Sequence, residues 1–469
     1  MPRIKYATIL RVLVILGLFC VWLQIMVSSG LERDGGSTNG VDVDSETLVT
    51  PAREELMNGN DTSEQVLALV PQELHKYLTV HPRNNTANST DLPKNITEIR
   101  RAIKRYNDAQ TIYNEDIYGP VLNDTVIIAI QVHTRLTYLR HLIVSLAQAR
   151  DIERTLLVFS HDYYDEEINS LVRTIDFTKV MQIFYPFSIQ THPNEFPGVH
   201  PNDCPRDAKF EQAIKLKCNN ALHPDLHGHY REAKYTQTKH HWWWKANRIF
   251  NQLQCTASHT GMVVFLEEDH YVAEDFLHVL NLMRTTADKT CPQCELLSLG
   301  TYLKTYQYHA TADKVEITPW HSSIHNMGMV FNRTVWNSIM SLQDQFCEYD
   351  DYNWDYSLLH LSQNRKGREK FKVMMSKGPR VFHIGECGLH HKKSNCNANL
   401  VISKVQKLLQ TTKHLLYPKR LTASINPGGA KHNKKLVKGN GGWGDRRDQE
   451  MCTNMTKADR QLKKYVYFA

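Results

Sequence analysis

The amino-acid sequence predicts an α/β domain built around a parallel sheet. Continuous apolar runs of strand length stand at residues 126–132, 155–160 and 180–187, and amphipathic helical patterns separate them at 136–149 and 166–175. Strands that are apolar throughout are buried on both faces, and helices that alternate with them are typical crossover connections of a parallel sheet. Four later apolar runs predict further strands of the same domain, at residues 262–270, 296–302, 328–332 and 380–385.

The N-terminus predicts a membrane anchor. Residues 9–27 are apolar except for Arg11 and Gln24, and cations precede them while acids follow. A hydrophobic helix with its cations on the N-terminal side is typical of a signal-anchor, which would leave residues 1–8 in the cytosol and the rest of the chain in the lumen. A cleaved signal peptide is the alternative, although residues 28–30 match its cleavage pattern only loosely.

Residues 28–107 predict a lumenal stem between the anchor and the α/β pattern. This stretch is rich in Gly, Ser, Thr, Asn and charged residues, and we expect it to be mostly extended with one weak helix at residues 63–78. The folded domain would then occupy residues 108–469. Seven Asn-x-Ser/Thr sequons agree with a lumenal position, at Asn60, Asn84, Asn88, Asn95, Asn123, Asn332 and Asn454.

Cysteine content and net charge narrow the class of protein. One of the ten cysteines lies in the anchor, and the nine after it should mostly pair in an oxidising lumen, which leaves at least one thiol over. Cys255 is our candidate because it lies near the end of an apolar helical pattern. Much of the net charge of +7 comes from residues 404–464, which lack the interleaved aromatic residues of nucleic-acid-binding surfaces. We therefore expect no nucleic-acid partner.

Acidic residues end the strand predicted at residues 262–270. Residues 266–270 read LEEDH, and three consecutive acids at the end of a buried strand would repel one another unless a cation or solvent relieved them. Oxygen ligands suit Mn²⁺ or Mg²⁺, and a nucleotide diphosphate could complete the coordination shell. Ligands of open α/β sheets bind beyond the carboxyl ends of the strands, where these acids are expected. A solvated loop start is the alternative for the triplet taken alone.

A second acidic segment combines carboxylates with aromatic rings. Residues 348–356 read EYDDYNWDY, and Asp350, Asp351 and Asp355 lie among tyrosines and a tryptophan. Partly apolar surroundings raise the pKa of a carboxyl group and suit it to act as a general base, and aromatic rings offer flat faces to sugars. The alternative is an aspartate that caps a helix among packing aromatic residues.

Histidine-containing segments carry weaker indications. In QTKHHWWWK, residues 237–245, His240 and His241 point to different faces of a helix, Lys239 could contact phosphate, and the tryptophans are expected to pack. His383 ends an apolar run and could bind a metal, although a lone strand histidine is more often structural. A further cluster could form a zinc site, but a disulfide is favoured in the lumen: Cys387, His390, His391 and Cys396.

Other common catalytic motifs are missing from the sequence. It contains no G-x-S-x-G, Walker A or H-E-x-x-H motif, which removes the commonest hydrolase, P-loop and zincin interpretations. The glycines at 439, 441 and 444 fit G-x-G-x-x-G by spacing, but no predicted strand precedes them.

Laid out in this way, the sequence resembles the N-acetylglucosaminyltransferase II family. The resemblance runs from about residue 125 to residue 452, and rare strings such as QTKHHWWWK exclude chance similarity. It implies a GT-A type, Rossmann-like fold and an inverting transfer of N-acetylglucosamine from UDP-N-acetylglucosamine (UDP-GlcNAc) to the α-1,6-linked mannose of a hybrid N-glycan, in a type II protein of the Golgi membrane. The matching strings include QVHTR (131–135), VFSHD (158–162), FLEEDHY (265–271), LSLGTY (297–302), YDDYNWDY (349–356) and NGGWGD (440–445).

The resemblance also implies roles for residues. Asp355 would be the general base, Asp269 would bind Mn²⁺, and His383 would be a second metal ligand, against the structural role that a lone strand histidine suggests. One carboxylate that takes the proton from the attacking hydroxyl, with a metal that neutralises the departing diphosphate, suffices for an inverting displacement. The donor or acceptor site would be lined by Gln131, Val132, His133, Thr134, Arg135, Asp162, Gln237, Thr238, Lys239, His240 and His241.

Disulfides and departures from the family complete the expectations. An acceptor-binding arginine of the family falls on Tyr306, and a further family bridge lacks cysteines near Ser341 and Gln363. Alternatives that stay open are a related β-1,2-N-acetylglucosaminyltransferase for another mannose, a non-catalytic glycan-binding protein and a metallohydrolase, and homodimer formation is also open. The implied bridges are Cys204–Cys218, Cys291–Cys294, Cys347–Cys452 and Cys387–Cys396, with Cys255 free.

Overall fold

The computed structural model describes residues 66–79, 95–303, 305–365, 367, 369–385, 398–426 and 438–456. The predicted tail at residues 1–8 and anchor at residues 9–27 lie outside these ranges. Across the described ranges, no helix combines the length and the hydrophobicity that a bilayer span requires.

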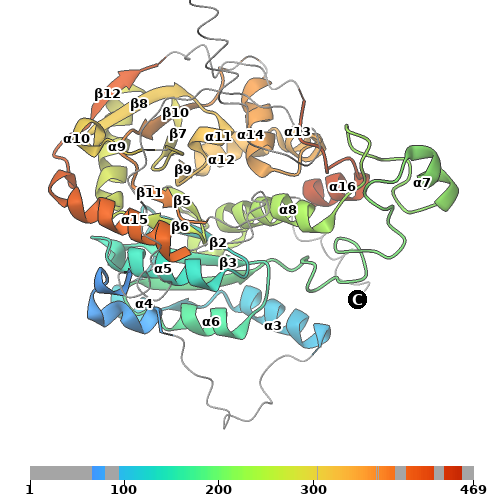
Figure 1. Cartoon of the computed structure of the whole chain (residues 1–469), viewed down its shortest axis with the longest axis horizontal. Coiled ribbons are helices and arrows are strands. Elements are labelled where there is room, and N and C mark those ends of the chain that lie inside the picture. Colours follow the sequence, from blue (N-terminus) through green and yellow to red (C-terminus); the bar gives the residue numbers. More distant parts are fainter. Residues whose placement is uncertain are drawn as a thin grey trace, which may run out of the picture. The chain divides into compact units, whose positions relative to one another are not determined.

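A ten-stranded sheet runs through the described residues (Figure 1). In spatial order its strands are β1 (Ile112–Tyr113), β4 (Lys179–Phe184), β3 (Leu156–His161), β2 (Ile127–Val132), β5 (Met262–Glu267), β9 (Met329–Asn332), β7 (Cys294–Ser298), β10 (Lys372–Ser376), β8 (Lys314–Pro319) and β12 (Thr422–Ile425). Parallel pairing joins β4, β3, β2 and β5. The prediction of an α/β domain with a parallel sheet is confirmed for this half.

The other half of the sheet is mixed in direction. β9 runs antiparallel to both β5 and β7, and β8 runs antiparallel to β10. The single strand predicted over residues 262–270 is wrong beyond Glu267, because the chain turns at Glu268 and Asp269, whose carboxylates bond to other elements. The chain then continues as β6 (His270–Val272), which pairs with β11 (Val381–His383) in a separate two-stranded sheet.

Helices cover both faces of the sheet, and alternate residues of β2 show why. Ile128 and Ile130 pack into one core, whereas Ile127 and Ala129 pack into the other, and all four are fully buried. Successive strand residues point to opposite faces, so helices on both sides bury an unbroken apolar strand. The first core includes α5 (Leu136–Ala147), α6 (Glu166–Arg173) and α9 (Phe276–Thr290), and the second includes α8 (Ala233–Asn247), α12 (Arg333–Met340) and α14 (Trp354–Gln363).

Two segments of the predicted stem pack on the sheet domain. The short helix η1 (Gln72–Tyr77) contacts α5 and buries Tyr77, whose hydroxyl donates to Asp176 Oδ1 at 2.6 Å. The amphipathic helix α3 (Ile96–Ala109) packs against β4, and both amide atoms of Asn107 bond to the β4 backbone at 2.7 and 2.9 Å. In the described ranges, the folded body therefore begins before residue 108.

Short helices occupy many of the connections between strands. Three disulfide bonds are present in the described residues. The pairs are Cys204–Cys218, Cys291–Cys294 and Cys347–Cys452, while Cys255 is a free cysteine, as the odd count required. Cys387 and Cys396 lie outside the described residues. Further α-helices within the described ranges are α4 (Glu115–Tyr118), α7 (Phe210–Leu216), α10 (Tyr308–Thr311), α11 (Ser322–His325), α13 (Gln343–Glu348), α15 (Ala398–Thr411) and α16 (Arg446–Asn454).

The bond between Cys347 and Cys452 joins α13 to α16 across 105 residues of sequence, and both half-cystines are fully buried. We expect the double variant Cys347→Ala, Cys452→Ala to lower the free energy of unfolding by about 4 kcal/mol, because a bridge across so long a loop constrains the unfolded chain strongly. Urea denaturation measures the change. Cys255→Ala is the control for loss of a cysteine, and equal midpoints for the wild type and the double variant would contradict the prediction.

Candidate active site

Acidic and imidazole side chains gather at the carboxyl end of β5. Glu267 is the last residue of β5, Glu268 and Asp269 form the turn, and His270 begins β6. Glu267, Asp269 and His270 each bring one ligand-type atom to within 4.8 Å of the others. Carboxylate and imidazole donors suit a divalent transition metal. We call Glu267, Glu268, Asp269 and His270 the acidic cluster. It lies at the edge where open α/β sheets bind ligands.

Arg135 relieves the repulsion within the acidic cluster. It lies directly before α5, and its Nε donates to Glu268 Oε1 while its Nη1 donates to Asp269 Oδ2, both at 2.8 Å. The backbone amide of His133 donates to the other Glu268 oxygen at 2.8 Å. Glu268 is thus engaged at both oxygens, whereas Asp269 Oδ1 is buried without a hydrogen-bond partner. Burial would raise the pKa of Asp269, but His383 and Arg135 hold it well below its ordinary value.

His383 reaches the same carboxylate from the second sheet. It lies opposite His270 in the β11–β6 pair, and its Nε2 is 3.0 Å from Asp269 Oδ2. Burial favours the neutral ring, yet the contact with Asp269 raises the pKa of His383 above its ordinary value. Burial lowers the pKa of His270 to about 3, and its Nδ1 accepts a hydrogen bond from the Glu267 amide at 3.2 Å. The neutral ring of His270 therefore carries its proton on Nε2.

Gly385 allows the backbone after β11 to approach the acidic cluster closely. A Cβ atom at this position would lie 2.2 Å from Asp269 Oδ2 and 3.1 Å from Arg135 Nη1. A larger residue would therefore displace the carboxylate or the guanidinium, since no side chain tolerates a contact as short as the first. Glycine here is a requirement of the site.

A second hydrogen-bonded group centres on Asp162, the residue after β3. His133 Nδ1 lies 2.6 Å from Asp162 Oδ1, Gln237 Nε2 donates to Oδ2 at 3.0 Å, and His241 Nδ1 lies 3.4 Å from Oδ2. Burial alone would raise the pKa of Asp162, but His133 and His241 hold it well below its ordinary value. The group therefore joins α8 to the carboxyl ends of β2 and β3.

One face of α8 supplies Gln237, His241 and Lys245, which follow one another at four-residue steps. Residues at this spacing share a helix face. Lys245 is buried, and its Nζ donates to Gln131 Oε1 at 2.8 Å. Burial lowers the pKa of Lys245, and the nearby charge of Glu267 opposes that effect. Lys245 is absent from the residues predicted from the sequence, although its spacing from Gln237 and His241 marks the same face.

The other face of α8 packs within the protein. Lys239 Nζ donates to the backbone oxygens of Tyr349 and Asp351, each at 3.0 Å. His240 Nε2 lies 2.9 Å from Asp448 Oδ1. Lys239 is buried against carbonyl groups, so the structure does not bring it to the acidic cluster as a phosphate contact. The expectation that His240 and His241 face different sides of the helix is confirmed.

The remaining predicted lining residues differ in their surroundings. Val132 is fully buried in the sheet, where it belongs to the core that contains α5. Thr134 is exposed in the loop that follows β2, and Thr238 is half-buried on α8. Within the predicted segment 131–135, the side chains of Gln131, His133 and Arg135 make the contacts described above.

Asp355 lies in the first turn of α14, as a lone half-buried carboxylate. Asn326 Nδ2 donates to its Oδ2 at 3.0 Å, and the Tyr356 amide donates to its Oδ1 at 2.9 Å. Burial raises the pKa of Asp355 to about 7, and the negative charges of Asp351 and Glu267 add to the shift. The backbone connects Asp355 to the acidic cluster. Met327, next to Asn326, accepts a hydrogen bond from Gly300, and Gly300 bridges to Val381 of β11, the strand that carries His383.

Tyr302 lies beside His383. Its ring centroid is 6.1 Å from that of His383, and half of its surface is exposed, at 50%. Burial of the hydroxyl, together with the charges of Glu267, Asp355 and Asp269, raises the pKa of Tyr302. Tyr302 is likewise absent from the residues predicted from the sequence, although it ends both an apolar strand pattern at residues 296–302 and the family-like string LSLGTY at residues 297–302.

Fold and site together define a class of enzyme. An acid and histidine cluster suited to a cation and a separate carboxylic acid with a near-neutral pKa share the carboxyl edge of an α/β sheet. These are the parts of a glycosyltransferase, which uses a nucleotide-sugar donor and a glycan acceptor. The chain belongs to the N-acetylglucosaminyltransferase II family, because residues 100–452 match the family model described as N-acetylglucosaminyltransferase II (MGAT2).

Relatives from animals and plants agree with this membership. The alpha-1,6-mannosyl-glycoprotein 2-beta-N-acetylglucosaminyltransferase of Sus scrofa is 42% identical over 353 residues, which cover 75% of this chain and 78% of the relative. The Homo sapiens protein of that name is 42% identical over 360 residues, with 75% and 78% covered. The Arabidopsis thaliana protein of that name is 33% identical over 344 residues, with 72% and 76% covered.

Two solved structures show a distant likeness. Staphylococcus aureus TarS matches with a TM-score of 0.28 at 10% identity, covering 55% of this chain and 60% of that one. Mouse xyloside xylosyltransferase 1 matches with a TM-score of 0.25 at 10% identity, covering 50% of this chain and 75% of that one. Values this low carry no argument about fold or function.

Proposed function

We propose that the chain is an inverting glycosyltransferase of the GT-A type. It would transfer N-acetylglucosamine from UDP-N-acetylglucosamine, in β-1,2 linkage, to the α-1,6-arm mannose of a hybrid N-glycan. The observation that carries this proposal is family membership over residues 100–452, with relatives at 42% identity that bear the corresponding name.

Asp355 is the proposed general base. An inverting displacement needs one group that takes the proton from the attacking hydroxyl, and such a base works best when its pKa lies near the working pH. The pKa of about 7 that burial gives Asp355 meets this requirement. Asn326 and the Tyr356 amide each bond to one oxygen of Asp355 and would hold the carboxylate in place for the mannose hydroxyl.

The residues around Asp269 fit a divalent cation, which we propose to be Mn²⁺. Asp269 Oδ1 is buried and makes no hydrogen bond, so it has a free acceptor for a cation. His383 is the proposed nitrogen ligand, because Nδ1 of His270 already accepts the Glu267 amide and its Nε2 carries the proton. When bound, the cation would offset the negative charge of the departing diphosphate.

The donor and acceptor would lie between the acidic cluster and Asp355. We propose that the side chains of Gln131, His133 and Arg135 line this space from the loop after β2. Asp162 joins them through its bond to His133, and Gln237 and His241 join through Asp162. Tyr302 is a further proposed contact, since its half-exposed ring lies beside that of His383.

The proposed location is the Golgi membrane. The anchor would be residues 9–27 in type II orientation, which places the catalytic domain in the lumen where N-glycans are remodelled. Homodimer formation in that membrane is compatible with this proposal.

A second candidate is a β-1,2-N-acetylglucosaminyltransferase that acts on another mannose. The observation that favours it is Tyr306, which stands where the resemblance implies an acceptor-binding arginine. The Tyr306 ring packs edge-on against Phe382, with centroids 5.3 Å apart, and so gives no substitute for a guanidinium.

An acceptor panel decides between the two candidates. We expect product only when the acceptor carries a free α-1,6-arm mannose, in reactions of the purified domain with UDP-N-acetylglucosamine and Mn²⁺. Mass spectrometry and linkage analysis of the products provide the measurement. Equal turnover of an O-mannose acceptor or of the α-1,3 arm would overturn the first candidate.

Asp355→Asn should lower kcat by about 10³-fold, because general-base catalysis contributes roughly 10²- to 10⁴-fold. In the wild type, log(kcat/KM) should rise with pH and level off above about 7, since only the deprotonated Asp355 accepts a proton.

The pKa of Asp355 is raised in the fold, so burial of its charge costs stability as pH rises through about 7. Asp355→Asn should therefore raise Tm at pH 8 while it removes activity, and full turnover of this variant would exclude the proposed base.

The affinity for Mn²⁺ should distinguish His383, the proposed ligand, from His270. We expect Asp269→Asn and His383→Ala to weaken Mn²⁺ binding at least about tenfold, and His270→Asn to weaken it less, because His270 has no free acceptor nitrogen. Electron paramagnetic resonance of free Mn²⁺ measures the affinity without any turnover. A larger loss for His270→Asn than for His383→Ala would reverse the ligand assignment.

A further inference from the structure

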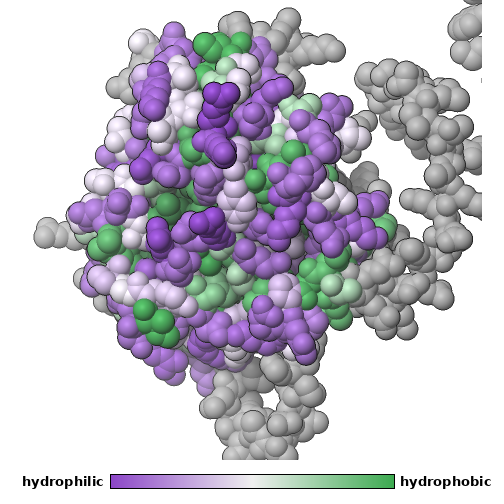
Figure 2. All heavy atoms as spheres, turned by 90° about the vertical axis from the view of Figure 1, so that its left-hand side faces the viewer, coloured by the Kyte–Doolittle hydropathy of each residue, from purple (hydrophilic) through white to green (hydrophobic). Residues whose placement is uncertain are grey.

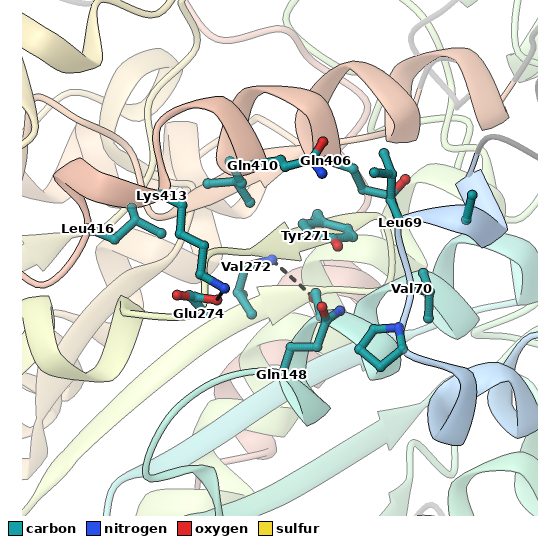
Figure 3. Close-up of a pocket in the computed structure, with 14 residues that line it drawn as sticks. Leu69, Val70, Gln148, Tyr271, Val272, Glu274, Gln406, Gln410, Lys413 and Leu416 are labelled. Carbon is teal, nitrogen blue, oxygen red and sulfur yellow. Dashed lines mark hydrogen bonds and ion pairs between the residues drawn. The ribbon is translucent and has the colours of Figure 1, made fainter.

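A cavity of about 390 Å³ lies beside β6, outside the catalytic site (Figure 3). Residues 68–71, α5, β6 and α15 form its walls, and none of the acidic cluster residues lines it. A water molecule takes about 30 Å³ of liquid volume, and small-molecule pockets start at roughly 300 Å³. The cavity is therefore large enough for a small organic molecule.

Gln406 gives this cavity a specific polar feature. It belongs to α15 and is 5% exposed, and neither its amide nitrogen nor its amide oxygen makes a well-formed hydrogen bond. A buried amide without such partners is costly and uncommon in folded proteins. Figure 3 places the Gln406 amide above the Tyr271 ring, with Gln148, the residue after α5, below. The Gln406 amide offers one donor side and one acceptor side to an occupant.

The lining of the cavity carries no uncompensated charge. Its charged side chains are Glu274 and Lys413, which lie 3.6 Å apart as an ion pair. The other polar side chains are hydroxyls and amides, beside aliphatic groups such as Leu69 and Leu416. This composition disfavours a phosphate or a metal ion and favours a neutral molecule that both donates and accepts hydrogen bonds.

The surroundings favour a small ligand over a large apolar partner. Figure 2 shows the side of the molecule that carries α15 on the left of Figure 1. Hydrophilic side chains cover most of that side, and apolar ones form separate spots. The buried end of the cavity has Tyr271, Gln406 and Ser145, while Gln410 and Lys413 are exposed at its rim. Small-molecule pockets combine aromatic and apolar side chains with a few polar groups that orient the ligand, and this cavity has such a lining.

We propose that this cavity is a second carbohydrate-binding site, in which the Gln406 amide hydrogen-bonds a neutral sugar residue that rests near Tyr271. The proposal does not depend on the acceptor or the base assigned to the catalytic site. It names a sugar because hydroxyl or acetamido groups pair with a carboxamide in both directions.

Ligand-observed NMR on the full catalytic domain tests the proposal. The probes are N-acetylglucosamine and methyl α-mannoside, with saturating UDP and Mn²⁺ present to occupy the catalytic site. We expect at least one sugar to bind, and Gln406→Leu to weaken its affinity at least about tenfold. Leu69→Trp, which fills the cavity without removing the amide, should weaken it similarly. Neither residue belongs to the catalytic site, so transfer activity should remain.

Control variants distinguish sugar binding in this cavity from binding in the catalytic site or on the surface. Gln254→Leu makes the same exchange at an exposed glutamine outside the cavity and should bind sugar like the wild type. Gln406→Leu should keep or raise Tm, because it removes a buried amide without well-formed hydrogen bonds. Absence of sugar binding, competition by UDP, or unchanged binding in both cavity variants would overturn the proposal. Water alone would then fill the cavity.

Discussion

The guanidinium of Arg135 is the contact on which the rest of the site depends. Three consecutive acids end a buried strand, and buried charges are costly unless they are paired. Arg135 bonds to Glu268 and Asp269 at once, which lets Glu268 fasten the loop after β2 while one oxygen of Asp269 stays free. Loss of either contact would leave the turn between β5 and β6 carrying excess negative charge at the point where the donor is proposed to bind.

Helix α8 is the wall shared by the two halves of the site. Gln237 and Lys245, on one face of the helix, donate to Asp162 and Gln131. Trp242, on another face, stacks on Trp354 with ring centroids 4.5 Å apart. Trp354 directly precedes Asp355. The same helix therefore positions the residues beside the acidic cluster and the start of the helix that carries the lone carboxylate, so their separation is set by packing rather than by flexible loops.

The sequence predicted the strands, which follow from local hydrophobic pattern. It missed side-chain roles that depend on contacts with residues distant in the sequence. The apolar runs at residues 126–132, 155–160 and 180–187 became β2, β3 and β4, because unbroken apolar strands need two covered faces. Lys239 looked free for phosphate, but its partners are backbone carbonyls about 110 residues away, which no local pattern reveals. The acidic triplet at the end of β5 indicated a cation site by itself, and family resemblance then selected Asp269 and His383 as ligands, whereas Tyr302 needed the folded chain. The polar stem composition likewise hid the few apolar residues with which η1 and α3 pack.

The buried bridge between Cys347 and Cys452 has a consequence for biosynthesis. Translation proceeds from the N-terminus, so the oxidation partner of Cys347 is synthesised 105 residues after it. The parallel strands and α8 can assemble earlier, but α13 and the adjoining α14 gain their covalent tie last. A nascent chain that stops short of residue 452 could thus form the parallel strands, while α13, next to the helix that carries the proposed base, would lack its covalent tie to α16.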